Sequence, residues 1–127
     1  MAAPGAVSLV SFRALLHQGA NGSEISVDWV TSAELDTFGF HIYLGADDTI
    51  GSARQMTSQM ILGEGSNGGI YHFSMPYDPA TDPPLASLAV WLVETEIDGS
   101  LNYYGPTRVV DPASLTKNNY MPLIMRP

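Results

Sequence analysis

The chain has 127 residues, no cysteine and a formal net charge of −8, with thirteen acidic residues against five basic ones. This length suits one domain with a single hydrophobic core, which needs neither disulfides nor a structural metal. The negative charge opposes a phosphate backbone and no basic cluster offsets it, so the composition argues against nucleic-acid binding. The longest apolar run, residues 85–93, is far below the roughly 20 residues that cross a bilayer, so no membrane span is expected.

Apolar and polar residues alternate with a period of two along most of the chain, which predicts β-strands. Seven strands are expected, and the fourth is either one strand or two short pieces. They cover residues 7–16, 24–31, 38–44, 53–62, 70–75, 87–97 and 101–110.

Three local signals refine this pattern. The apolar residues of the first strand change parity between Leu9 and Val10, which predicts a β-bulge or a strand that changes sheets. Asp98-Gly99 separates the last two strands and predicts a hairpin with a type I′ turn, whose two central residues both need positive φ. Residues 78–84 are too rich in proline for a strand and predict a long surface loop.

The second and third strands predict the centre of the core. Ile25, Val27 and Trp29 share one face of the second strand, and Phe38, Phe40, Ile42 and Leu44 share one face of the third. A buried tryptophan that faces aromatic residues on the next strand can fill the middle of a two-sheet core. The residues expected to be buried are Trp29, Phe40, Ile42, Trp91 and Val27.

These two strands also carry a family resemblance. Trp29-Val-Thr-Ser-Ala-Glu-Leu-Asp36 followed by Gly39-Phe-His-Ile-Tyr43 resembles the fibronectin type III-like module of secreted bacterial multidomain proteins. Residues 91–99 and 104–106 fit the last hairpin of that module. The resemblance covers roughly residues 7–110 and implies an extracellular or cell-surface protein without catalytic residues. We therefore expect an all-β immunoglobulin/fibronectin type III-like sandwich of about seven strands over residues 1–117.

No pattern in the sequence predicts an enzyme or a bound cofactor. Residues 63–68 match G-x-G-x-x-G, but a predicted strand follows where a dinucleotide site needs a helix, so a hairpin loop is the better interpretation. His17, His41 and His72 are isolated and lack metal-binding spacing. The chain has no cysteine, and no serine lies in a nucleophile elbow.

Three weaker signals concern ligands and modification. Exposed tyrosines on the predicted strands are candidates for a carbohydrate-stacking surface. Asn21-Gly22-Ser23 is a glycosylation sequon on a predicted turn. Carboxylates gather in predicted loops, where calcium is one interpretation and solvated charge is the other. The tyrosines are Tyr43, Tyr103 and Tyr104, and the carboxylates are Asp47, Asp48, Asp78, Asp82, Glu34 and Asp36.

The last ten residues, 118–127, form a separate apolar segment, which we call the C-terminal arm. Left exposed, its apolar side chains would make an adhesive patch. Pro122 cannot donate to a β-ladder, which restricts the arm to an edge strand or an extended segment. The candidate assembly residues are Tyr120, Met121, Leu123, Ile124 and Met125.

These features together predict a non-catalytic extracellular subunit that associates with itself. We expect the C-terminal arm of one subunit to add to the sheet of the next, with Leu123 and Ile124 buried there, and to build a homo-oligomer or filament. The alternative segment for this role is the N-terminal arm, Met1–Leu9. A competing possibility is that the C-terminal arm folds back over an open edge of its own domain. The alternative function is an accessory module of a secreted multidomain protein that binds carbohydrate or protein.

Overall fold

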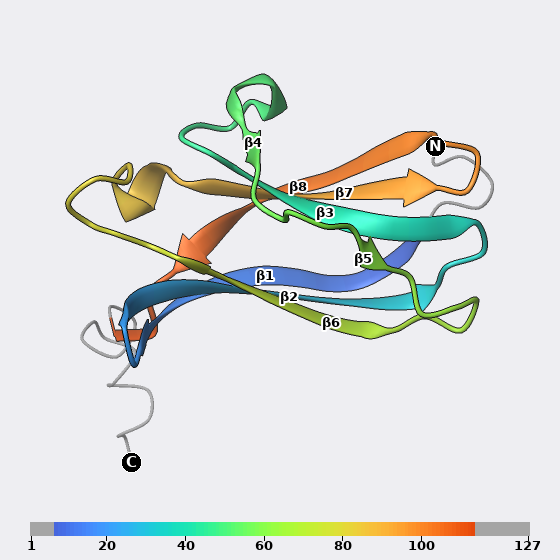
Figure 1. The fold of residues 1–127 in the computed structure, drawn as a ribbon, viewed down its shortest axis with the longest axis horizontal. Helices are drawn as coiled ribbons and strands as arrows, with labels where there is room; N and C mark the ends of the chain where they lie inside the picture. Colours follow the sequence, from blue (N-terminus) through green and yellow to red (C-terminus); the bar gives the residue numbers. More distant parts are fainter. Residues whose placement is uncertain (1–6, 114–127) are drawn as a thin grey trace, which may run out of the picture.

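The computed structural model describes residues 7–113, which form eight β-strands and two short 3₁₀ helices (Figure 1). The all-β class is confirmed, and the predicted strand over residues 53–62 consists of two short strands. The elements are β1 (Ser8–Gly19), β2 (Gly22–Ala33), β3 (Thr37–Gly45), η1 (Ile50–Ser52), β4 (Arg54–Gln55), β5 (Ile61–Leu62), β6 (Ile70–Pro76), η2 (Leu85–Ser87), β7 (Ala89–Glu96) and β8 (Leu101–Val110).

The strands form one curled mixed sheet in the order β4-β3-β7-β8-β1-β2-β6, with β5 also paired to β3. Neighbouring strands are antiparallel except β1 and β8, which run parallel where Ala14 faces Val109 and Leu15 faces Val110. The curl brings β1, β2 and β6 opposite β3, β7 and the first part of β8, so that the core lies between two layers (Figure 1).

The core centres on Trp29, as the strand pattern predicts. Its ring stacks on Tyr71 of β6 with centroids 5.2 Å apart and meets Phe40 of β3 edge to face at 5.7 Å. The expected burial of Val27, Phe40 and Ile42 is also confirmed, since each is fully buried. Trp91 was expected in the core but is only partly buried. Its neighbours Val90 and Leu92 point inward, so the alternation of β7 turns the Trp91 side chain to the outer face.

Irregularities in β1 and β3 decide which of their side chains point inward. The parity change near Leu9 and Val10 is confirmed as a pair of register shifts between Ser8 and Ser11. A second shift lies in β3, where Thr37 pairs with Glu96 and Gly39 with Thr95. Phe38 is the extra residue there, and it is 54% exposed although alternation predicts it beside Phe40.

The β7–β8 hairpin differs from the expected type I′ turn. Gly99 has φ +92°, but Asp98 does not have positive φ. Gly99 N–H donates to the Glu96 carbonyl at 2.9 Å, and Glu96 N–H donates to the Ser100 carbonyl at 2.8 Å. This pattern is a type I turn followed by a left-handed glycine. Asp98 Oδ1 accepts the Ser100 N–H at 2.9 Å, and this bond ties the Asp98 side chain to the strand that follows.

Candidate functional site

Strand β6 ends the sheet and pairs, among residues 7–113, with β2 alone. Tyr77 N–H donates to the Ser23 carbonyl at 2.9 Å, and Thr31 N–H donates to the Gly69 carbonyl at 2.9 Å. Alternate residues of an antiparallel strand bond to the same neighbour, so the odd-numbered residues of β6 turn their main-chain groups to β2. The N–H and C=O groups that point away from the sheet, which we call the β6 edge, belong to Ile70, His72 and Ser74.

The side chains of β6 follow the same alternation. Tyr71 and Met75 are buried in the core, and Phe73 packs against it while remaining partly exposed. Ile70, at the start of the strand, is 78% exposed. The β6 edge therefore combines free main-chain groups with apolar surface, which is the combination that an added strand requires.

Glu34 fixes the start of β6 from inside the protein. Its Oε2 accepts hydrogen bonds from Thr31 Oγ1 and Tyr71 OH, each at 2.5 Å, and its Oε1 accepts the Glu64 N–H at 2.9 Å. Burial, followed by the bond to Glu34, raises the pKa of Tyr71. Glu34 lies in the β2–β3 connection, as expected, but it is not a solvated charge: it is a buried acceptor that joins β2, β6 and the segment between β5 and β6.

The glycine-rich segment at residues 63–68 is part of this junction. Gly68 has φ +86°, and a Cβ there would lie 2.2 Å from the Thr31 carbonyl oxygen. Gly69 N–H donates to Thr31 Oγ1 at 2.8 Å. Strand β6 follows at once, as expected for a hairpin loop. Gly68 therefore serves close packing against β2.

Large apolar side chains gather at one end of the molecule, where the β2–β3, β5–β6 and β7–β8 connections lie together (Figure 1). Across β5, β3, β7 and β8, the pairing aligns Leu62 with Gly39, Thr95 and Leu101. The β7–β8 turn joins this group because Ile97 N–H donates to the Asp36 carbonyl at 2.8 Å. We call this surface the apolar end, and its members, between 50% and 70% exposed, are Leu35, Phe38, Leu62, Ile97 and Leu101.

Two buried carboxylates lie beneath the apolar end. Glu94 is fully buried, and its oxygens accept bonds from Thr37 Oγ1 at 2.5 Å and Asn102 Nδ2 at 3.0 Å. Asn102 Nδ2 also donates to Glu96 Oε2 at 2.6 Å. A cavity of about 280 Å³ adjoins Glu96. It is also lined by Asp36, Ile97 and Asp98, so the apolar end has an acidic border.

Sequence reasoning missed this pair because carboxylates are rarely buried. The signal that could have found them is parity, since Glu94 and Glu96 continue the inward series of Val90 and Leu92. Tyr104 completes the group by donating to Glu94 Oε1 at 3.3 Å. Burial, and then the Glu94 charge and bond, raise the pKa of Tyr104 to about 12.

The candidate carbohydrate-stacking tyrosines do not share one face. Tyr104 lies on the core side with Glu94, so its expected exposure is wrong. Tyr43 pairs with Trp91, and Tyr103 pairs with Val93, on the outer face of β3, β7 and β8. Two of the three tyrosines thus flank a partly buried tryptophan.

The three histidines lie apart and each has a local partner. His17 Nε2 is 3.5 Å from Glu24, and His41 Nδ1 is 2.6 Å from Thr57 Oγ1. Burial lowers the pKa of His41. His72 Nδ1 lies 2.8 Å from Asp28. Within residues 7–113, no three His, Asp or Glu side chains are grouped to hold a metal ion.

We expect the triple variant His17→Ala, His41→Ala, His72→Ala to keep the circular dichroism spectrum and the sedimentation behaviour of the parent protein. The reason is that no two of these side chains share a site, and each contact above is local. A structure with two of them and a carboxylate around one zinc ion, at about 2.1 Å, would contradict this expectation.

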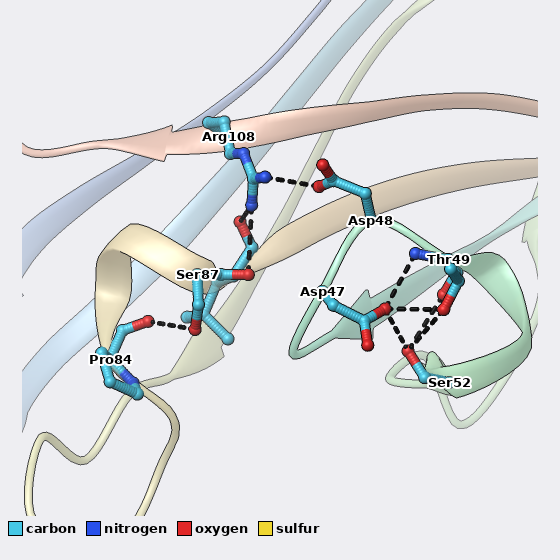
Figure 2. A network of polar contacts seen from close by, with 8 residues as sticks. Asp47, Asp48, Thr49, Ser52, Pro84, Ser87 and Arg108 are labelled. Carbon is cyan, nitrogen blue, oxygen red and sulfur yellow. Dashed lines mark hydrogen bonds and ion pairs between the residues drawn. The ribbon is translucent and has the colours of Figure 1, made fainter.

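The loop carboxylates are engaged in bonds within the protein (Figure 2). Asp47 Oδ1 accepts the Thr49 N–H and hydroxyl and the Ser52 hydroxyl, and these bonds lower its pKa. Asp48 pairs with Arg108 at 2.5 Å, and Arg108 also donates to the carbonyls of Ser87 and Leu88. These contacts tie the β3–β4 loop to β8 and to the start of β7. In the long loop, Asp82 Oδ2 accepts the Asp78 N–H and Asp78 Oδ1 accepts the Ala80 N–H.

Two other predicted features are the glycosylation sequon and the assembly residues. Asn21 is exposed on the β1–β2 turn, where a modifying enzyme can reach it, and its glycosylation stays a prediction. The candidate assembly residues of the C-terminal arm lie outside the described residues: Tyr120, Met121, Leu123, Ile124 and Met125.

Comparisons with known proteins give no relative for this chain. No family model matches the sequence, and neither the curated proteins nor the solved structures contain a significant match. Within residues 7–113, no helix is long and apolar enough to cross a membrane. The function must therefore be inferred from the chain's own residues and contacts.

Proposed function

We propose that this chain is a fibronectin type III-like, non-catalytic structural module that associates head to tail with copies of itself in an extracellular or cell-surface setting. Support for the module comes from the connectivity. Strands β1, β2 and β6 face strands β4, β3, β7 and β8, and the first described strand, β1, pairs with the last, β8. Greek-key sandwiches of the immunoglobulin kind divide their strands between two layers in this way. The resembling motif from Trp29 to Tyr43 runs along β2 and β3, as the family implies.

The observation that carries the proposal is the apolar end. Five large apolar side chains, each at least half exposed, lie on adjacent strands and turns at one end of the molecule. Scattered exposed apolar residues are normal, but five of them on neighbouring strands and turns at one end of the molecule favour a contact surface there. Burying each side chain would contribute about 1.5–3 kcal/mol. Contact with another subunit would supply that burial.

The arrangement of the ends favours a chain of subunits over a closed dimer. Strand β8 begins at the apolar end with Leu101 and finishes at the opposite end with Val110, so the described part of the chain ends on the far side from the apolar end (Figure 1). A contact between unlike surfaces at opposite ends leaves one of each free on every subunit. Such heterologous contacts build filaments when they do not close into a ring.

We expect the intact protein to associate as its concentration rises, and a variant lacking residues 118–127 to remain monomeric with its β-sheet circular dichroism retained. Sedimentation velocity and negative-stain microscopy measure both properties. If the truncated chain unfolds while the intact protein sediments as a monomer, the arm serves its own domain and the proposal is wrong.

Variants of the apolar end provide an independent test of the same association. Phe38→Ser with Leu101→Ser should weaken association, whereas Arg54→Ser, an exposed change on β4 between the two ends (Figure 1), should not. Exposed substitutions of this kind usually change stability by less than about 0.5 kcal/mol, so folding is preserved in both. Equal association of the two variants would contradict a contact at the apolar end.

The alternative function, an accessory carbohydrate-binding module, is favoured by one observation. Tyr43, Trp91 and Tyr103 lie on the outer face of β3, β7 and β8, where aromatic rings can stack on sugar rings. Affinity electrophoresis in gels that contain soluble polysaccharide tests this possibility. Retardation of a protein that remains monomeric, and its loss in Tyr103→Ala, would support the alternative over self-association.

A further inference from the structure

We infer that the β6 edge of one subunit is the acceptor for the C-terminal arm of the next, which adds to it as a parallel strand. This inference rests on the proposed self-association and identifies the surfaces that meet. Ile70, His72 and Ser74 present main-chain donors and acceptors that no described strand uses. Natural edge strands are usually protected by lysine, proline or a covering segment. Strand β6 contains no lysine or arginine, and its proline, Pro76, is at its far end.

Charge complementarity identifies the C-terminal arm as the occupant. Two of the five basic residues, Lys117 and Arg126, flank the apolar residues of the arm, and no acidic residue lies after Asp111. The surface beside β6 carries two carboxylates and one arginine: Glu24 pairs with Pro76 and Asp28 with His72 across the β2–β6 ladder, and Arg13 of β1 lies opposite Asp28. A basic, apolar segment therefore meets a surface of opposite net charge, which favours encounter and register.

Pro122 restricts how the arm can pair. Proline lacks an N–H, so it belongs where a strand's main-chain groups face away from the ladder. The residues whose N–H groups face β6 are then Met121, Leu123 and Met125, because alternate residues bond to the same neighbour. Pro122 itself lies on the new outer edge, where its missing donor discourages the addition of a further strand. The arm thus closes the edge that it occupies.

The head-to-tail arrangement sets the strand direction. A neighbour's arm arrives at the apolar end, where β6 begins with Ile70, and runs toward Pro76, parallel to β6 (Figure 1). In a parallel pair, a residue whose main-chain groups point to the other strand lies opposite a residue whose main-chain groups point away from it. The side chains of these two opposite residues lie on the same face of the sheet. Leu123 then shares the core face with Phe73, whereas Ile124 faces solvent. This register replaces the expectation that Leu123 and Ile124 are both buried, because adjacent strand residues face opposite sides.

The test uses two matched pairs of variants in the full chain. Ser74→Pro removes an N–H that points away from β2, so β6 remains paired, while Ser74→Ala removes the hydroxyl and keeps the N–H. Leu123→Asp places a charge on the core face of the arm, while Ile124→Asp places the same charge on the solvent face. We expect Ser74→Pro and Leu123→Asp to raise the concentration of half-assembly at least tenfold in sedimentation velocity, and the two control variants to change it less than about threefold.

Each other outcome has a definite meaning. Normal assembly of a folded Ser74→Pro variant overturns the β6 edge as acceptor and leaves self-association standing. Normal assembly of Leu123→Asp with loss in Ile124→Asp overturns the parallel register. A parent protein that is monomeric at every concentration overturns both the acceptor and the proposed function. The Leu123 and Ile124 variants do not depend on the folding of Ser74→Pro, so the test remains decisive if Ser74→Pro fails to fold.

Discussion

Replacing Trp29 with alanine will lower the free energy of unfolding by about 3–5 kcal/mol. The ring is fully buried, stacks on Tyr71 and meets Phe40 edge to face, so its removal eliminates two aromatic contacts and leaves a cavity between the layers. Urea unfolding monitored by circular dichroism measures the loss, with a midpoint that moves to lower urea concentration.

Trp91→Ala is the matched control, because Trp91 lies on the outer face and is only partly buried. Its loss should cost clearly less than the loss of Trp29. Equal costs for the two variants would mean that the full burial of Trp29 between the layers contributes no more than the partial burial of Trp91 on the outer face, which contradicts the core as described.

Glu94→Ala will destabilise the protein by about 3–5 kcal/mol, although glutamate is usually a surface residue. Truncation removes the acceptor for Thr37 Oγ1, Asn102 Nδ2 and Tyr104 OH and leaves these donors without it in a buried place. Each buried polar group that loses its partner costs about 1–3 kcal/mol. Chemical denaturation at neutral pH provides the measurement.

Two further variants separate hydrogen bonding from size and charge. Glu94→Gln keeps a carbonyl acceptor and the volume of the side chain, so it should retain part of the lost stability. Glu24→Ala removes a half-exposed carboxylate from β2 and should change the unfolding free energy by less than about 0.5 kcal/mol. A Glu94→Ala variant as stable as the parent would show that the buried carboxylate contributes nothing to the fold.

The strands and the centre of the core were predictable because they depend on alternation, which a single sequence displays. Val27 and Trp29 follow that rule in β2, and Phe40 and Ile42 follow it in the part of β3 beyond the bulge. Phe38 fails it because one extra residue in β3 reverses its direction, and the sequence contains no separate mark of that bulge.

The turn and the polar contacts were less predictable for a different reason. Asp98-Gly99 fits two hairpin geometries, and the choice depends on the register of the flanking strands. Glu94 and Glu34 are buried because donors from distant segments converge on them, which no local pattern displays. The β6 edge is likewise a property of the sheet order, since any strand looks the same in sequence whether central or terminal.

The parallel pairing of β1 and β8 has a mechanical consequence. The first and last described strands both run from the apolar end toward the opposite end, side by side at Ala14–Val109 and Leu15–Val110 (Figure 1). Tension that pulls the start of β1 one way and the end of β8 the other acts along these strands. The hydrogen bonds between them then resist as a group in shear instead of opening one at a time. A filament of such subunits under tension would be held at this junction within each subunit.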